Sequence, residues 1–435
     1  MKIRSLLPLG LALAFLVAIP YAGRAEDAPA APATAEESEG VPAGWSYDFD
    51  GTASWHAVDN PYFSTDVAHW REAFVRGRVH YGLPAGAYLT VGGVGAVTMD
   101  TDYYGVGDEY DGLLDQLLVG LPHVGGSDLS LTIGRQNMTL GDGFLVGDGY
   151  RDHFAALWNI PLSFYDGVLA NWARGPHHVT AFAADVSPSF TAVLSDLSGD
   201  REVAPDGILA GGEIGWSPGE GKELALALVK RTDDSEIAYE PMAMSLRGAW
   251  TRGVWGVAGE AVLESGQWGD TDLAGKGGHL RVTWAGEGKY EPALKAEYFY
   301  YSGDDPDTDD KLEAYDPLQY SWSDWSNYYV GDLLASTVGT ASNMRIMMLQ
   351  AAFTPREGTG VRLLAHRFDR AKADTEPFAY EFDAVIDQKF GEHWSGWLMG
   401  AYASPLDAAK LEFGDNTSTQ VFLALTYKIG GKLSQ

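Results

Sequence analysis

The chain has 435 residues, with 60 acidic and 30 basic side chains, 53 glycines, 14 tryptophans and no cysteine. The lack of cysteine excludes disulfides, thiolate zinc sites and iron–sulfur clusters. A formal charge of −30 argues against a general nucleic-acid binder, because phosphate contacts need clustered Lys and Arg. The abundance of glycine and aromatic residues favours a protein built from β-strands.

Residues 1–25 have the pattern of a secretory signal peptide. Lys2 and Arg4 give a basic start, an apolar stretch follows, and small residues precede Glu26. A membrane-spanning helix fits less well, because the apolar run is short and contains two prolines. Residues 26–44 are rich in Ala, Pro and Glu and are expected to be flexible. A secreted chain without cysteine favours the bacterial periplasm or outer membrane.

From residue 45 onward, apolar and polar side chains alternate. In residues 73–81, the even positions include Arg76, Arg78 and His80, whereas the odd positions are small, apolar or aromatic. Such a period of two places each set on its own face of a β-strand. The same alternation recurs in residues 242–250, 279–284, 380–390 and 420–428.

Repeated amphipathic strands suit either a soluble sandwich or barrel, or a membrane barrel. The segments run about ten residues, which is typical of outer-membrane barrels, and some end in aromatic residues such as 298–301 that would lie at the membrane–water boundary. Short turns such as 83–86 alternate with long polar stretches, including 142–164 and 302–343, that are expected to be extracellular or folded into the lumen. We therefore predict an all-β fold, a transmembrane antiparallel β-barrel of about 16–18 strands over residues 45–435, wide enough for an aqueous channel.

Three short motifs resemble those of one known family. Residues 133–147, IGRQNMTLGDGFLVG, resemble the "GRQ…GD…G" stretch of the bacterial alginate-export family of outer-membrane barrels. Residues 164–168 resemble its "FDGV" step, and residues 315–320 resemble its "FDPL" motif. The resemblance implies a large monomeric export or diffusion channel with arginines lining a constricted lumen. The acidic net charge departs from the electropositive pore of the family's alginate exporter, which leaves the cargo open.

Charged side chains on the face opposite the lipid are the candidate lumen and selectivity residues. Between low-dielectric walls, such groups act strongly on ions in a narrow water column. Arg135 shares the parity of apolar residues 129–133, so it requires a bulge near Gly134 or a place at the rim. The candidates are Arg76, Arg78, His80, Arg135, Arg247, His279, Arg281, Lys295, Glu297 and Arg362, with His366 as a further one.

In an alternative interpretation, the basic residues pair with acidic residues across neighbouring strands and only fill and stiffen the lumen. The acidic residues considered as partners are Glu72, Glu260, Glu264, Glu297, Glu381 and Asp383.

One acidic stretch has the alternating carboxylates that calcium prefers, at Asp305, Asp307 and Asp309. The glycine needed at the sixth position of an EF-hand-like frame is replaced by Asp310, which favours a solvated acidic loop. Apart from loosely bound calcium, we predict no cofactor.

Enzyme motifs such as the nucleophile elbow, HExxH and the phosphate-binding loop are absent from the sequence, so we predict no enzymatic activity. Three functions compete: a channel, a structural barrel that sheathes a partner such as an electron-transfer cytochrome, and a barrel enzyme acting on lipid. We predict a porin or exporter in the bacterial outer membrane that passes an anionic solute or polysaccharide. Its expected contacts are lipid, lipopolysaccharide and a periplasmic partner, with no nucleic acid.

Overall fold

A computed structural model of the protein describes most of the chain from residue 41 to residue 433. Residues 1–40, which contain the expected signal peptide and most of the expected flexible segment, lie outside the described residues. The described residues are 41, 43–84, 86–99, 109–147, 150–151, 161–162, 165–185, 207–233, 238–305, 307–308, 310–316, 318, 325, 330, 342–373 and 377–433.

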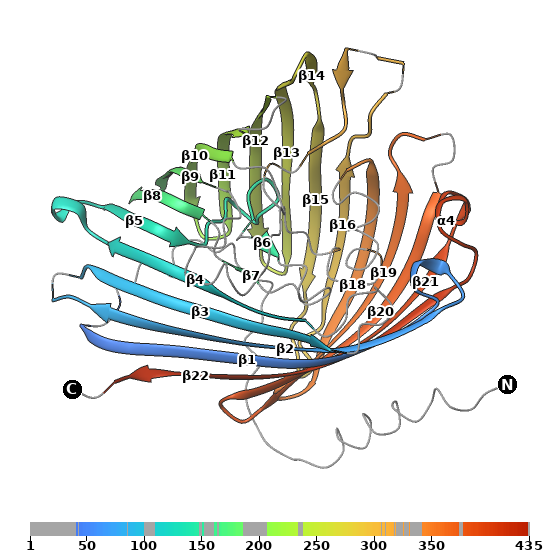
Figure 1. Ribbon diagram of the computed structural model, residues 1–435, viewed down its shortest axis with the longest axis horizontal. Helices are drawn as coiled ribbons and strands as arrows, with labels where there is room; N and C mark the ends of the chain where they lie inside the picture. The colour runs from blue at the N-terminus through green and yellow to red at the C-terminus, as the bar shows by residue number, and fades with distance from the viewer. Residues whose placement is uncertain are drawn as a thin grey trace.

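Within these described ranges, eighteen antiparallel strands form a closed barrel (Figure 1). The barrel closes where β1 (Gly44–Asp59) pairs with β22 (Ser418–Lys432). The predicted 16–18 strands are therefore confirmed. The other wall strands are β2 (Val67–Gly82), β3 (Tyr88–Met99), β4 (Glu109–Leu121), β5 (Leu129–Gln136), β8 (Tyr165–Arg174), β9 (His177–Asp185), β10 (Gly207–Gly219), β11 (Lys222–Asp233), β12 (Tyr239–Arg252), β13 (Trp255–Trp268), β15 (Lys276–Ala285), β16 (Ala293–Tyr301), β18 (Met344–Arg356), β19 (Thr359–Arg370), β20 (Pro377–Phe390) and β21 (Trp394–Pro405).

The remaining elements are short and belong to the connections. They are the paired strands β6 (Tyr150–Arg151) and β7 (Pro161–Leu162), the parallel pair β14 (Thr271–Leu273) and β17 (Lys311–Leu312), the single turns η2 (Pro61–Phe63) and η4 (Val124–Gly126), and helix α4 (Asp407–Glu412). No helix in the described part of the chain is long and apolar enough to cross a membrane.

The two ends of the barrel differ in the length of their connections. At one end the hairpins are tight, as at Gly175 and Gly253, whose φ angles of 59° and 58° lie in the left-handed region that glycine adopts without strain. The start of β1 and the end of β22 lie at this same end. The opposite end carries the long connections 137–164 and 302–343. In outer-membrane barrels the short turns face the periplasm, so we name the tight end the periplasmic end.

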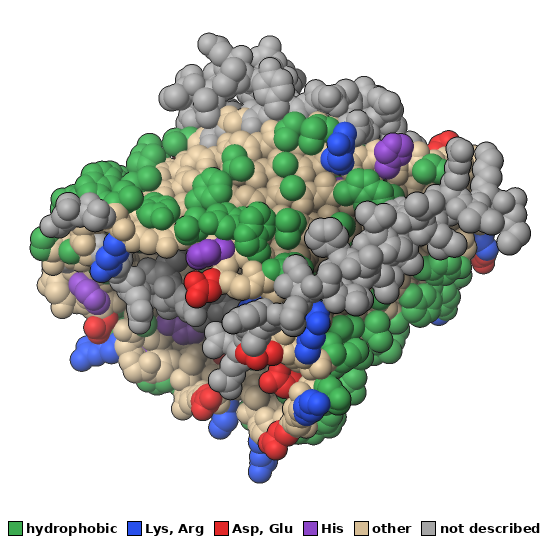
Figure 2. All heavy atoms as spheres, turned by 90° about the horizontal axis from the view of Figure 1, so that it is seen from below, with side chains coloured by type: hydrophobic (Ala, Val, Ile, Leu, Met, Phe, Trp, Pro, Cys, Tyr) green, Lys and Arg blue, Asp and Glu red, His purple; other side chains and the backbone are tan. Residues whose placement is uncertain are grey.

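The alternation in the sequence separates an apolar outer face from a polar inner face. Val75, Leu226 and Leu280 are each at least half exposed on the outside, whereas Arg76 and His279 on the opposite face are buried. Figure 2 shows hydrophobic side chains spread over the outer flanks, with charged side chains gathered toward the lower edge of that view. Such an apolar band suits contact with lipid.

An apolar core lies inside the barrel rather than between layers. Residues 137–147, here called the lumen insert, follow β5, and Met138, Leu140, Phe144, Leu145 and Val146 of this insert are almost completely buried. They share one apolar cluster with inward-facing residues of the wall. These wall residues include Phe182, Leu209, Val229, Phe299 and Tyr301. Ring contacts of Phe144 with His279 and Tyr301 place the lumen insert against the inner wall at β15 and β16.

Candidate lumen site

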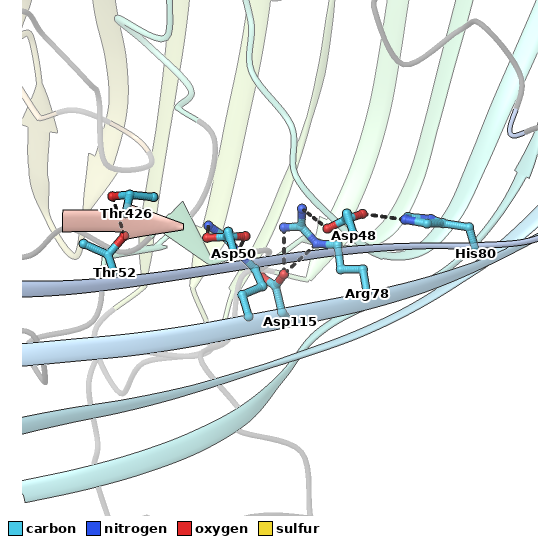
Figure 3. Close-up of polar contacts among 8 residues, drawn as sticks. Asp48, Asp50, Thr52, Arg78, His80, Asp115 and Thr426 are labelled. Carbon is cyan, nitrogen blue, oxygen red and sulfur yellow. Dashed lines mark hydrogen bonds and ion pairs between the residues drawn. The ribbon is translucent and has the colours of Figure 1, made fainter. Parts of the chain in front are cut away.

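A row of charged side chains follows the inner face of β1 and β2 near the periplasmic end (Figure 3). Asp50 lies opposite Arg76 and Asp48 lies opposite Arg78 in the antiparallel register. Arg76 donates from Nε and Nη2 to the two carboxylate oxygens of Asp50, at 3.1 and 3.3 Å. This bidentate ion pair fixes the guanidinium in one orientation.

Arg78 reaches across β3 to an aspartate on β4. Its Nε and Nη2 donate to Oδ2 of the fully buried Asp115, at 3.0 and 2.8 Å. Its Nη1 lies 3.9 Å from Oδ2 of Asp48, which is too far for a hydrogen bond. One edge of this guanidinium is thus firmly held, and its other edge faces a more distant carboxylate.

The sequence of β3 and β4 makes the contact between Arg78 and Asp115 sterically feasible. Gly92 lies between them, and a Cβ there would be 2.6 Å from Cγ of Arg78. The register of β3 and β4 shifts at Gly92 and Gly93, so that Asp115 is the extra residue of a bulge. A bulge turns a side chain that alternation would direct elsewhere, and here Asp115 and Gln116 are both buried.

His80 completes the row, which we call the mouth cluster: Asp48, Asp50, Arg76, Arg78, His80 and Asp115. His80 lies 2.6 Å from Oδ1 of Asp48 through Nε2 and 2.9 Å from the Thr90 hydroxyl through Nδ1. A cavity of about 520 Å³ opens beside the cluster. Its charged lining comprises Asp48, Asp50, Arg76, Arg78, Glu392, His393 and Lys428. A cavity of this size accommodates a small hydrophilic molecule.

Arg135 lies apart from the mouth cluster. Gly134 has a φ of 118°, and after this irregularity Arg135 is only 6% exposed, although Ile133 faces outward. Its Nε and Nη2 donate to the carboxylate of Asp166 at 2.8 and 2.5 Å. The contact joins β5 to β8 at the point where the lumen insert begins.

Four of the predicted residues gather beside the lumen insert. Arg247 contacts Glu213 at 2.9 Å and Glu223 at 2.8 Å. Arg281 lies 2.9 Å from Glu297, and His279 lies between that carboxylate and the carboxylate of Asp142 in the insert. These contacts join the inner wall to the polar side of the lumen insert.

The last two predicted residues lie elsewhere on the wall. Arg362 approaches Asp387 at 3.1 Å between β19 and β20, and Lys295 is half-buried on β16, opposite Gln350 of β18. The further candidate, His366, is buried 3.2 Å from Asp383. The predicted residues thus form separate groups along the inner face rather than one ring.

Most of the arginines pair with carboxylates that the sequence analysis did not name. Among the six acidic residues considered there, Glu297 is the one that the described contacts place on an arginine, Arg281. The others make different hydrogen bonds or ion pairs: Glu72 lies near His56, Glu264 accepts from the amide of Asp316, Glu381 accepts from the amide of Val330, and Asp383 lies near His366. Glu260 accepts from Ser245 and lies opposite Arg247 in the strand register. The missed partners include Asp48, Asp50, Asp115, Asp142 and Asp166. For Asp48 and Asp50, the alternation of the sequence already indicated an inward position beside the arginines of the next strand.

The acidic stretch considered for calcium is partly described. Asp305 is 2.5 Å from Nζ of Lys372 and also accepts from the amide of Asp307 at 3.2 Å, and Asp309 lies outside the described residues. The hydrogen bond from Lys372 lowers the pKa of Asp305. Because Lys372 already neutralises the charge of Asp305, this carboxylate should bind a calcium ion more weakly.

Comparison with known protein families assigns the chain to one of them. The family model for alginate export matches residues 108–392. The chain belongs to the alginate export family. A search of curated protein sequences found no match.

Solved structures show that the fold of this alginate-export family member is that of outer-membrane porins. Outer membrane protein OpdK from Pseudomonas aeruginosa is 12% identical with a TM-score of 0.58, and the match covers 89% of this chain and 99% of that chain. OpdK with vanillate gives 13% identity and a TM-score of 0.58 over 89% and 99% of the two chains. Acinetobacter baumannii OccAB4 gives 11% identity and a TM-score of 0.55 over 91% and 100%. The protein is an outer-membrane β-barrel channel of its family and not an enzyme.

Proposed function

We propose that this alginate-export family barrel passes a hydrophilic solute that carries a carboxylate, such as a sugar acid, and that the mouth cluster binds it briefly near the periplasmic opening. The observation that carries the proposal is the geometry of Arg78. Its guanidinium is fixed by Asp115 along one edge, and its Nη1 lies 3.9 Å from Asp48, which lines the cavity together with Arg78. A carboxylate in the cavity would find an oriented donor there.

The charges around the cavity support weak and reversible binding. Arg76, Arg78 and Lys428 are balanced by Asp48, Asp50 and Glu392 along the same lining. A solute carboxylate therefore replaces a long contact to Asp48 instead of meeting an uncompensated positive field. Conduction requires binding that is weak enough for release. We expect a modest anion preference, in which the paired arginines bind the solute weakly at successive positions along the wall.

The filling of the lumen favours a channel over the alternative of a sheath for a partner protein. A sheath needs a wide and evenly polar interior, whereas the lumen insert packs Phe144, Leu145 and Val146 against the wall inside this barrel. The space left beside the mouth cluster suits a small solute better than a folded protein. The solved structure of OpdK with vanillate combines a barrel of this fold with a carboxylate, which agrees with the proposed class of solute.

The proposal is tested by comparing a sugar acid with an uncharged polyol of similar size. Purified barrel in liposomes should admit gluconate with a saturable rate and sorbitol without saturation. Arg78→Gln should raise the gluconate concentration needed for half-saturation several-fold. Arg78→Lys should raise it less, because the positive charge remains while the bidentate geometry of the guanidinium is lost. Lys222→Gln, which removes an exposed charge outside the cavity, is the matched control. Equal, unsaturable entry of both solutes in the wild type and in Arg78→Gln would contradict the proposal.

A further inference from the structure

The lumen insert meets the barrel wall at a compact group of three side chains. Asp142 comes from the insert, Glu260 from β13 and His279 from β15, and each offers one ligand atom within 4.8 Å of the others. Glu260 and His279 lie directly opposite each other in the register of these two strands. Nε2 of His279 is 3.2 Å from Oδ2 of Asp142. The group therefore joins a loop to two adjacent strands.

One carboxylate oxygen of this group is buried without a hydrogen bond. Glu260 is 7% exposed; one of its oxygens accepts from the hydroxyl of Ser245, and Oε2 makes no hydrogen bond within the described residues. His279 is also 7% exposed, and its Nε2 has the carboxylate of Asp142 as an ion-pair partner at 3.2 Å. Buried polar atoms normally have partners, so Oε2 of Glu260 indicates a missing one.

The orientation of His279 matches that of a metal-binding histidine. Its Nδ1 lies 3.1 Å from Oε1 of Glu297, which holds the ring and directs Nε2 toward Asp142 and Glu260. Metal-bound histidines commonly bind a carboxylate through the second ring nitrogen in this manner, which fixes the ring and raises its basicity as a ligand.

A divalent cation would balance the charge of this group. Asp142, Glu260 and Glu297 contribute three negative charges, and Arg281, 2.9 Å from Glu297 and 3.8 Å from Asp142, contributes one positive charge. With a neutral imidazole, as metal ligation requires, the sum is minus two. The neighbouring Arg247 lies opposite Glu260 in the register of β12 and β13 and contacts two other carboxylates, those of Glu213 and Glu223.

A second group of similar composition lacks this balance. His178, Glu213 and Glu223 also lie within 4.8 Å of one another through their ligand atoms. Arg247, however, contacts both glutamates at 2.9 and 2.8 Å and so supplies a cation to them directly. This second group therefore serves as a matched comparison within the same barrel.

We propose that Asp142, Glu260 and His279 bind one divalent transition-metal ion, with Zn²⁺ as the best fit, and that the ion fastens the lumen insert to the wall. One imidazole with two carboxylates suits Zn²⁺, whereas Ca²⁺ takes oxygen ligands alone. Zinc bonds of about 2.0–2.2 Å place ligand atoms roughly 3.3 Å apart, and the 3.2 Å between His279 and Asp142 already fits this spacing.

The test is a titration of chelator-treated barrel in detergent with Zn²⁺ by calorimetry. We expect one Zn²⁺ per barrel in the wild type and at least a tenfold weaker affinity in Glu260→Gln and in Asp142→Asn. His178→Gln should bind as the wild type does. Heat-modifiable migration on gels shows whether each variant is folded. If Glu260→Gln, which alters the wall, does not fold, Asp142→Asn still tests the proposal because it alters only the insert.

Three results would overturn the proposal. The first is a wild-type barrel that takes up no Zn²⁺ in this titration. The second is a loss of affinity in His178→Gln as large as that in Asp142→Asn. The third is competition by Ca²⁺ at the same concentration as Zn²⁺, because it would show a site made of oxygens in which His279 has no part. Co²⁺ in place of Zn²⁺ should give visible absorption bands that Asp142→Asn weakens.

Discussion

The inner wall of the barrel is packed with apolar side chains on one side of the lumen and carries paired charges on the other. The strands β15 and β16 pack their inner face against the apolar lumen insert at Phe144, whereas β1 and β2 present ion pairs to a cavity. Both walls have the same alternation in sequence. The difference teaches that alternation decides which face turns inward, and that a single connecting segment decides whether this face becomes a packed core or a polar channel wall.

The packed side should be the more sensitive to loss of volume. Phe144 of the lumen insert is 2% exposed and its ring stacks on Tyr301 at 5.5 Å. Phe144→Ala should lower the free energy of unfolding by about 3–5 kcal/mol, the usual cost of such a cavity, as measured by urea unfolding in detergent. Leu226→Ala on the lipid-facing side is the control and should cost much less. Equal costs would show that Phe144 in the insert stabilises the barrel no more than a lipid-facing side chain does.

The polar side should be sensitive to the position of one charge. In Gly92→Ala the new Cβ would be 2.6 Å from Cγ of Arg78 and should push this side chain away from Asp115. The loss of this ion pair from a fully buried carboxylate should cost about 1–3 kcal/mol, and gluconate saturation should weaken with it. Gly77→Ala is the control, because its Cβ would meet only Phe49, at 3.9 Å. A Gly92→Ala barrel with unchanged transport and stability would show that Arg78 has room to move.

A smaller effect is expected at the seam of the barrel on the polar side. The hydroxyls of Thr52 on β1 and Thr426 on β22 are 2.8 Å apart. Thr52→Val keeps the shape but removes this hydrogen bond, at a cost of up to about 1 kcal/mol. Urea unfolding measures the cost, and Thr52→Ser, which keeps the hydroxyl, should recover most of it. A loss above that seen for Gly92→Ala would reverse this order of effects.

The least effect is expected outside both walls. Lys372 and Asp305 form an exposed ion pair between two connections. Solvent and salt screen such pairs, so Lys372→Gln should leave the unfolding curve and the reversal potential in planar bilayers unchanged. A clear shift in reversal potential would show that the charges of these connections influence ion passage.

The fold and the faces of the strands could be predicted because they depend on local information. A side-chain period of two assigns Arg76 and Val75 to opposite faces without knowledge of any neighbouring strand. The odd parity of Arg135 similarly required a break in the pattern, which Gly134 supplies with its φ of 118°.

The ion-pair partners could not be predicted in the same way, because they depend on the register between strands. Arg78 binds Asp115 two strands away, which requires the missing side chain of Gly92 and the bulge in β4. Asp142 lay in a stretch that the sequence assigned only to an extracellular or lumen-folded loop. Its approach to His279 depends on the apolar packing of the whole insert, including Phe144.

The pairing of β1 with β22 has a consequence for the biogenesis of the protein. Thr52 and Thr426, which meet across this seam, are 374 residues apart in the chain. The hydrogen bonds that remove the last two open strand edges therefore cannot form until the C-terminal strand has been delivered. Contacts between such distant segments form slowly, and an unclosed sheet exposes edges that can pair with other chains. The emerging polypeptide should thus depend on periplasmic chaperones up to its final strand, and a truncation before Ser418 should leave it open to aggregation and proteolysis.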